Sequence, residues 1–156
     1  MTEEDYEEWL PAHLEEFAAG KVRAGNWPAE GAVERARQQM RELLPQGVAT
    51  PGHLLFHIWD DARAKSVGSL WIKTGEPIQG NSVFIYNIEV HEVERGRGYG
   101  SATLTELIKQ MTKAGAKNIA LHVFAFNEAA YRLYVRHGFI VTNINMSKPL
   151  YQTISV

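Results

Sequence analysis

The stretch IYNIEVHEVERGRGYG, residues 85–100, decides the fold of this chain. Its first half is rich in β-branched and aromatic residues, which is typical of a strand. Three glycines, Gly96, Gly98 and Gly100, follow and lead into a helical pattern. Glycines let a backbone approach a ligand closely, and the first N–H groups of a helix are unpaired and partly positive. The stretch therefore indicates an anion site suited to a pyrophosphate.

Two familiar pyrophosphate motifs do not fit this turn. A P-loop needs Gly-Lys-Ser/Thr, and the sequence Tyr99-Gly100-Ser101 supplies no lysine. A dinucleotide-binding fingerprint needs the spacing G-x-G-x-x-G, whereas the glycines here follow G-x-G-x-G. On its own, the turn can equally be a tight connection between a strand and a helix that binds nothing.

Helices and strands surround this stretch in an order that predicts an α+β fold. Hydrophobic periodicity predicts helices over residues 3–19, 28–44, 98–113 and 127–137, and strands over 54–59, 67–73, 83–91, 118–124 and 139–146. Residues 2–5 resemble a capping box, Pro11 is expected to kink or break the first helix near Leu10, and Pro28 fits the first position of the second. We expect a sheet of mixed direction in a single domain, residues 1–156.

The composition excludes several classes of protein. Of the 156 residues, 45% are apolar and 22% are charged, which is typical of a soluble globular domain. The absence of cysteine excludes a disulfide framework, a thiolate metal site and a cysteine nucleophile. No apolar run reaches the ~18 residues of a membrane helix, and the acidic N-terminus lacks the core of a signal peptide. We therefore expect a cytoplasmic protein that does not bind membranes.

Charge is distributed unevenly along the chain, although the net charge is only −2. Residues 1–94 carry 16 acidic and 8 basic side chains, and residues 95–156 carry 2 acidic and 8 basic side chains. This split favours an anion near the second segment and a cation near the first, although seven of the acids belong to the first predicted helix. No basic stripe is repeated along the chain, which argues against a nucleic-acid partner.

The motif Arg95-x-x-Gly98-x-Gly100 resembles the acetyl-CoA signature R/Q-x-x-G-x-G/A of the GNAT superfamily of N-acetyltransferases. Residues 127–139 are similar to a second pattern of that family, N-x-x-A-x-x-L-Y-x-x-x-G-F. The resemblance is densest over residues 85–141, and more loosely the chain resembles an uncharacterised subgroup from Bacillus-type bacteria. It implies the GNAT (acyl-CoA N-acyltransferase) fold, a mixed, mostly antiparallel sheet with a splayed parallel strand pair, flanked by helices. Family members usually begin with a strand, which is short, missing or trimmed here.

The resemblance implies that acetyl-CoA is the acyl donor and that no metal ion is needed. The pantetheine arm would lie along the backbone of residues 88–90, where the N–H near Val90 would polarise the thioester carbonyl. The N–H groups of the glycine turn would hold the pyrophosphate, and Arg95 or Arg97 would either reach a phosphate or remain solvated. The residues implied in binding acetyl-CoA are Ile88, Val90, Arg95, Gly96, Arg97, Gly98, Tyr99, Gly100, Ser101, Asn127, Ala130 and Tyr134.

Two residues are candidates for proton transfer. The resemblance implies that Tyr134 protonates the departing thiolate, and the alternative is a tyrosine of the hydrophobic core. Glu89 lies in an otherwise apolar strand, where burial would raise its pKa toward neutrality and suit it to deprotonate an amine. The alternatives are a solvent-facing Glu89 with no catalytic role, a base at His91 or His122, and a base acting through water.

The acceptor site is expected between the first two helices, the hairpin and the strand ends. Its candidate lining residues are Trp27, His53, Trp71, Tyr86, Glu89 and His122. The expected acceptor is a small-molecule amine or a peptide N-terminus, which attacks the thioester directly in a ternary complex. The rival hypothesis is a non-catalytic acetyl-CoA-binding sensor or interaction module. Many members of the family dimerise, so a homodimer is the default expectation.

Overall fold

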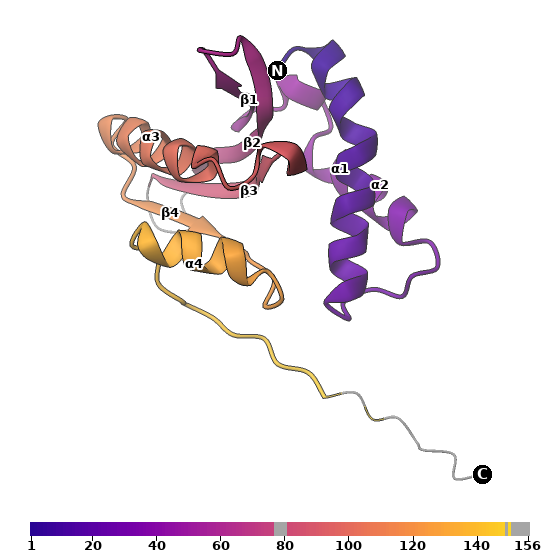
Figure 1. The fold of residues 1–156 in the computed structure, drawn as a ribbon. Helices are drawn as coiled ribbons and strands as arrows, with labels where there is room; N and C mark the ends of the chain where they lie inside the picture. The colour runs from indigo at the N-terminus through magenta and orange to yellow at the C-terminus, as the bar shows by residue number, and fades with distance from the viewer. Residues whose placement is uncertain (77–80, 149, 151–156) are drawn as a thin grey trace, which may run out of the picture.

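A four-stranded sheet lies at the centre of the molecule (Figure 1). The computed structural model describes residues 1–76, 81–148 and 150. The strands are β1 (His53–Asp60), β2 (Lys65–Glu76), β3 (Ser82–Val90) and β4 (Asn118–Leu121), in that spatial order. The first three strands are antiparallel, and β3 and β4 are parallel. This arrangement confirms the predicted α+β class and the mixed, mostly antiparallel sheet.

Helices cover both faces of the sheet. Helices α1 (Glu3–Arg23) and α2 (Ala32–Leu43) share one hydrophobic cluster with β1 and β2. Helices α3 (Tyr99–Lys113) and α4 (Glu128–Arg136) share a second cluster with β1, β2 and β3. Short 3-10 helices, η1 (Gly47–Ala49) and η2 (Glu92–Glu94), precede β1 and α3. Among the described residues, we find no helix with the length and apolarity needed to span a membrane.

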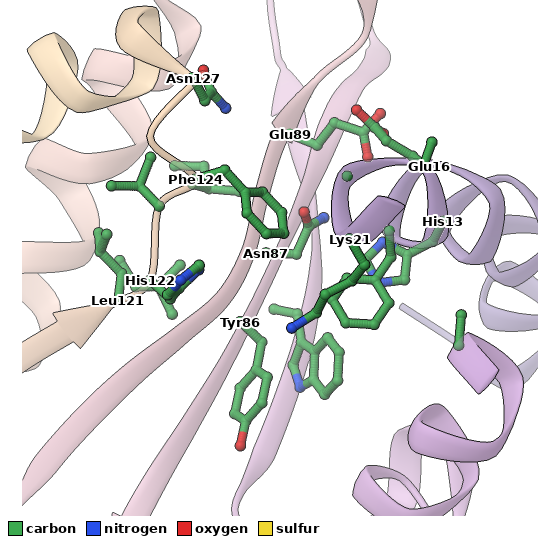
Figure 2. Close-up of a pocket in the computed structure, with 18 of the residues that line it drawn as sticks. His13, Glu16, Lys21, Tyr86, Asn87, Glu89, Leu121, His122, Phe124 and Asn127 are labelled. Carbon is green, nitrogen blue, oxygen red and sulfur yellow. The ribbon is translucent and has the colours of Figure 1, made fainter. Parts of the chain in front are cut away.

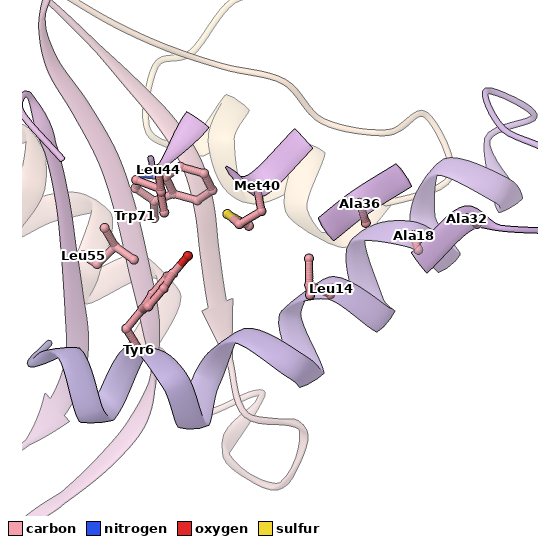
Figure 3. Packing of buried hydrophobic residues seen from close by; sticks show 9 residues of the cluster. All are labelled: Tyr6, Leu14, Ala18, Ala32, Ala36, Met40, Leu44, Leu55 and Trp71. Atoms are coloured by element: carbon pink, nitrogen blue, oxygen red, sulfur yellow. The ribbon is translucent and has the colours of Figure 1, made fainter. Parts of the chain in front are cut away.

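Small side chains hold α1 and α2 close together (Figure 3). Ala18 of α1 and Ala32 and Ala36 of α2 are buried between the two helices, next to the buried Leu14. Alanine leaves little bulk at a helix contact, so the two backbones can approach closely and pack tightly. This packing fixes the second half of α1, which contributes side chains to the functional site.

The first helix does not break at Pro11. Its capping box is present, because the Thr2 hydroxyl accepts from the N–H of Asp5 and the Asp5 carboxylate accepts from the N–H of Thr2. The helix then continues without a break to Arg23. Proline removes one helical hydrogen bond, but the packing of the buried face of α1 outweighs that loss. The predicted break near Leu10 is therefore wrong, and the helix predicted over residues 3–19 extends to Arg23.

The second helix begins later than predicted. Gly31 adopts a φ of 67° and caps α2, which starts at Ala32 rather than at Pro28. The left-handed conformation of Gly31 ends the preceding turn and redirects the chain into the helix. The carbonyl oxygen of Pro28 accepts a hydrogen bond from the Arg35 side chain at 2.6 Å, which ties the turn to α2.

The predicted strand over residues 139–146 is absent. Residues 139–148 form no regular secondary structure, and Figure 1 shows them leading away from the sheet after α4. A strand needs a neighbouring backbone for its hydrogen bonds, and within the described chain these residues have none. The predicted strand over 118–124 also ends early, at Leu121.

A β-bulge interrupts β3 at Tyr86. Trp71 of β2 pairs with Asn87, whereas the next residue, Ile72, pairs with Ile85. Tyr86 is therefore an extra residue in β3, and two residues of that strand oppose one of β2.

The bulge reverses the alternation of side chains along β3. Val83 and Ile85 pack in the cluster with α3 and α4, and after the bulge Ile88 and Val90 pack in that same cluster. Strict alternation from Val83 would have directed Glu89 into this apolar cluster. Because of the extra residue, Glu89 instead faces α1 on the opposite side of the sheet (Figure 2).

Candidate active site

The parallel strands β3 and β4 part near the middle of the sheet. They pair only from Ser82 to Ile85 of β3 and from Asn118 to Leu121 of β4. Beyond this point β3 continues to Val90, while the chain that follows β4 leaves the sheet and leads into α4. Figure 2 shows β3 separated from residues 122–127, with Phe124 projecting between them. The edge of β3 along residues 86–90 is therefore free of a β4 partner, and the two strands are splayed.

A cavity of about 520 Å³ opens at this point. Its walls come from α1, α2, β2, β3, the end of β4 with the chain that follows it, and α4. The side chains that carry its chemistry are His13, Glu16, Lys21, Trp71, Tyr86, Asn87, Glu89, His122, Asn127 and Tyr134. A mostly apolar cavity of this size, with a few convergent polar groups, suits a small molecule or the end of a larger one.

Two carboxyl groups meet at one end of the cavity. Figure 2 shows the carboxyl groups of Glu89 and Glu16 side by side, from β3 and α1. Burial, and then the charge of Glu16, raise the pKa of Glu89 to about 7, although Arg95 opposes this effect. Neighbouring carboxylates resist simultaneous ionisation, so Glu89 exchanges a proton near neutral pH. A group of this kind can act as a general base.

Tyr134 supplies a proton donor on another wall of the same cavity. Its side chain is buried, and the ring of Phe139 packs edge-on against it with the centroids 5.7 Å apart. Burial raises the pKa of the Tyr134 phenol to about 12. The hydroxyl therefore stays protonated at neutral pH and is able to donate a proton to a stronger base.

The glycine turn between η2 and α3 has the backbone that an anion site requires. Gly96 and Gly98 have φ angles of 77° and 86°, in the left-handed region that favours glycine. Among the described residues, we find no hydrogen-bond partner for the backbone N–H groups of residues 96–101. These groups gather at the N-terminus of α3, where the helix dipole adds positive potential.

Glu94 fastens this turn to the hairpin of β1 and β2. Its side chain is only 3% exposed. It accepts hydrogen bonds from Arg63 and Lys65, and these bonds hold the pKa of Glu94 down at about 2. In addition, the Tyr99 hydroxyl donates to Asp60 at 2.5 Å. The turn is thus held in place from both ends.

Comparison with known proteins decides the family. The model of the acetyltransferase (GNAT) family matches residues 6–139. The chain belongs to the GNAT acetyltransferase family. Its fold and its acyltransferase class follow from this membership, as the motifs around Arg95 and Asn127 predict.

Relatives of this GNAT chain are similar over nearly their full length. YdgE of Bacillus subtilis, named an uncharacterised N-acetyltransferase, is 33% identical over 150 residues, which is 96% of this chain and 95% of YdgE. The crystal structure of YycN from Bacillus subtilis is 34% identical, has a TM-score of 0.92, and matches 97% of this chain and 96% of its own. The N-alpha-acetyltransferase MAK3 of Arabidopsis thaliana is 34% identical over 134 residues, 81% of this chain and 70% of MAK3.

The cavity of this GNAT chain brings together some of the predicted site residues. These are Tyr86, Ile88, Glu89, His122, Asn127 and Tyr134. The Asn127 side chain also accepts from the N–H of Ala130 at 3.2 Å, which confirms the predicted helix cap. On β3 the lining ends at Glu89, and the carbonyl oxygen of the next residue, Val90, accepts from the Arg95 side chain at 3.0 Å. The turn containing Arg97, Gly100 and Ser101 lies beyond Arg95, and there Ser101 contacts His137 at 2.9 Å.

Three other candidates lie outside the lining of the cavity. Trp27 packs edge-on against Phe17, with the ring centroids 5.6 Å apart. His53 is buried and accepts a hydrogen bond from the Trp71 indole at 2.9 Å. His91 is exposed at the start of η2. Trp27 and His53 therefore pack against residues of the cavity wall and support it. His91, in contrast, lies away from the cavity.

The sequence analysis misses the contribution of α1 to the cavity and several other residues that line it. His13, Glu16 and Lys21 come from α1, and Phe124 follows β4. The Lys21 ammonium lies 5.3 Å from the centroid of the Phe17 ring and 5.9 Å from that of Phe124. Burial lowers the pKa of His13 to about 4, so its imidazole is neutral. The helical spacing of the α1 residues is the signal that could have grouped them on one face.

Proposed function

We propose that this chain transfers an acetyl group from acetyl-CoA to a primary amine. The observation that carries the proposal is the position of Glu89. A carboxyl group with a pKa of about 7 lies in the same cavity as a protonated phenol, Tyr134, at the point where β3 and β4 separate. The pair gives one site a proton acceptor and a proton donor, which are the two groups that aminolysis of a thioester uses.

The geometry of the glycine turn and of β3 fits acetyl-CoA. Within the part of the chain that the structure describes, the N–H groups of residues 96–101 have no partner and suit the pyrophosphate. A Cβ built on Gly96 or Gly98 would meet no described atom within 4 Å besides its chain neighbours, so the space beside the turn is open. The unpaired edge of β3 at residues 88–90 suits the pantetheine arm, which carries amides able to bond to a strand edge. Asn127 and Ala130 would border the arm from the start of α4.

The proposed reaction needs no acyl-enzyme. Glu89 takes a proton from the acceptor ammonium, and the amine nitrogen then attacks the thioester carbonyl, whose oxygen is polarised by the N–H near Val90. The new C–N bond forms, the C–S bond breaks, and Tyr134 donates its proton to the departing thiolate. The nitrogen loses its extra proton as the amide forms, and that proton returns through water to the Tyr134 phenolate, while Glu89 releases its own proton to solvent. A thiolate is a fair leaving group, so we expect Tyr134 to contribute less than Glu89.

The acceptor is a cationic amine, either a small molecule or a peptide N-terminus. The carboxyl groups of Glu16 and Glu89 attract an ammonium group and can hold it beside the base. The likeness to MAK3, an N-alpha-acetyltransferase, supports a terminal amino group among the candidates. The aromatic rings of Trp71 and Tyr86, stacked with centroids 4.5 Å apart, provide an apolar wall for the rest of the acceptor.

A panel of amines and short peptides tests the proposal. The purified protein is incubated with acetyl-CoA and each acceptor, and the release of the CoA thiol is measured together with the mass of the product. We expect an acetylated product whose formation falls strongly in Glu89→Gln, while the exposed variant Glu8→Gln behaves as wild type. Binding of acetyl-CoA with hydrolysis only, across the whole panel, would favour the non-catalytic sensor instead.

A further inference from the structure

The cavity carries opposite charges at two places. Glu16 and Glu89 are the only acidic residues among the described residues that line it, and their carboxyl groups meet. Lys21 lines the same cavity from the last turn of α1. Figure 2 shows the Lys21 side chain directed away from both carboxyl groups, toward the part of the cavity that Tyr86 and His122 line. The cavity therefore has an acidic end and a basic end.

The Lys21 side chain is half-buried, and its ammonium lies over aromatic rings. The centroids of the Phe17, Trp27 and Phe124 rings are 5.3, 5.7 and 5.9 Å from the Lys21 nitrogen. These distances approach the limit of about 6 Å for such contacts, so the rings compensate only part of the charge. Within residues 1–76, 81–148 and 150, Lys21 forms no ion pair. An anion that entered the cavity would meet a cation that is held in place and not neutralised.

The position of Lys21 in the last turn of α1 does not account for where its side chain lies. Basic residues stabilise the C-terminal end of a helix, and the exposed Arg23 fits that role alone, stacked 4.2 Å from the centroid of Phe126. The Lys21 side chain instead reaches the chain that follows β4. Burial, and then the charge of Lys21, lower the pKa of His122, so this imidazole is neutral and Lys21 supplies the charge at the basic end.

The two ends are separated by about the length of two residues. Glu16 and Lys21 are five positions apart on α1, which is about 7.5 Å along the helix axis at 1.5 Å per residue. The stacked rings of Trp71 and Tyr86 form a neutral wall of the same cavity. An extended peptide spans about 3.3–3.6 Å per residue. A free α-amino acid, with both charges on one carbon, is therefore too short to reach both ends.

We propose that the acceptor carries a carboxylate about two residues from its amino group, and that Lys21 binds this carboxylate. Glu16 and Glu89 hold the ammonium at the acidic end, so one molecule satisfies both ends of the cavity. A peptide with an acidic second residue has this chemistry, and so does a dipeptide with a free C-terminus. Lys21 then determines specificity without touching a reacting atom. This inference rests on the proposed function and names the class of its acceptor.

Matched peptides test the preference for a carboxylate. The tripeptide amides Ala-Glu-Ala, Ala-Gln-Ala and Ala-Lys-Ala differ in the charge of the second residue, and the dipeptide Ala-Ala is compared with its amide. Thiol release and product mass are measured with wild type. We expect kcat/KM to be about tenfold higher for an acid than for its amide, and lowest for the lysine peptide. The pair that shows the preference identifies the source of the carboxylate.

Two failures of this experiment are distinguishable. Equal kcat/KM values for the acids and their amides would overturn the carboxylate preference while leaving acetyl transfer in place. If wild type acetylated none of these peptides and no amine of the wider panel, the proposed function would fail, and the inference would fail with it.

Charge reversal at Lys21 tests which residue sets the preference. We expect Lys21→Glu to favour the lysine peptide and Lys21→Met to lose the distinction between acid and amide. The differences should appear in KM rather than in kcat, because Lys21 lies away from the reacting atoms. Lys113→Met, which removes an exposed charge from α3, should keep the wild-type order. Circular dichroism checks that each variant is folded. Folded Lys21→Met that still prefers the acids would overturn the proposal.

Discussion

Gly68 of β2 lies against the carbonyl oxygen of Glu89. A Cβ built on Gly68 would stand 2.0 Å from that oxygen and 3.0 Å from the Cα of Val90. No real Cβ fits there, so only glycine lets β2 and β3 approach at the position that presents Glu89 to the cavity.

The variant Gly68→Ala should therefore displace β3 where it holds Glu89, the proposed base. We expect a loss of stability of about 1–3 kcal/mol, as for other overpacked sites, and a larger fractional loss of acetyl transfer than of helical content. Urea unfolding and the thiol-release assay measure the two effects. Ser66→Ala, in the same strand, adds no atom and serves as the control. Wild-type activity in Gly68→Ala would show that the close contact does not position Glu89.

The pH profile tests whether Glu89 is the base. For an ammonium acceptor, kcat/KM should rise with pH and level off above about 7, where Glu89 is ionised. The charge of Glu16 helps to raise this pKa, so Glu16→Gln should move the inflection to lower pH. Glu89→Gln should lower kcat and lose the inflection. If Glu16→Gln left the pH profile unchanged, Glu16 would have no influence on the pKa of the titrating group.

Removal of the Tyr134 hydroxyl should affect turnover more than binding. We expect Tyr134→Phe to lower kcat by ~10–100-fold while the KM for acetyl-CoA changes little. The ring is retained, so its packing on Phe139 and the stability of the fold are preserved. Steady-state kinetics at saturating acetyl-CoA check the prediction. Equal kcat values in variant and wild type would make Tyr134 a core residue only.

Glu94 should support the proposed acetyl-CoA site without contacting acetyl-CoA itself. We expect Glu94→Ala to weaken acetyl-CoA binding by roughly tenfold, because the turn loses its anchor on Arg63 and Lys65. Amide hydrogen exchange over residues 95–100 should accelerate in the same variant. Glu92→Ala, exposed in the same 3-10 helix, is the control. Unchanged exchange in Glu94→Ala would mean that the turn holds its shape unaided.

Local chemistry explains what the sequence predicts well. The glycine turn is predictable because the left-handed angles at Gly96 and Gly98 favour one residue type. The phase change along β3 is also present in the sequence, since apolar residues at Val83 and Ile85 are followed by Ile88 and Val90. That jump from odd to even positions is the sign of the bulge at Tyr86.

Long-range contacts explain which features of the site could not be predicted from the sequence. Glu16 stands on α1, 73 residues before Glu89, and only the packing of α1 on the sheet brings the two together. Glu94 likewise looks like one more acid in an acidic run until Arg63 and Lys65 meet it. Residues 139–148 include strand-forming residues, but a strand forms only where a second backbone lies alongside.

Calorimetric titration of acetyl-CoA tests the central claim most directly. The titrations use wild type and Gly98→Val, whose side chain is incompatible with the φ of 86°, with NAD as the comparison ligand. We predict that wild type binds acetyl-CoA with a dissociation constant around micromolar, about −8 kcal/mol, that NAD gives no heat, and that folded Gly98→Val loses the binding. Folded wild-type protein that gives no heat with acetyl-CoA would contradict the acetyl-CoA site and the transfer reaction built on it.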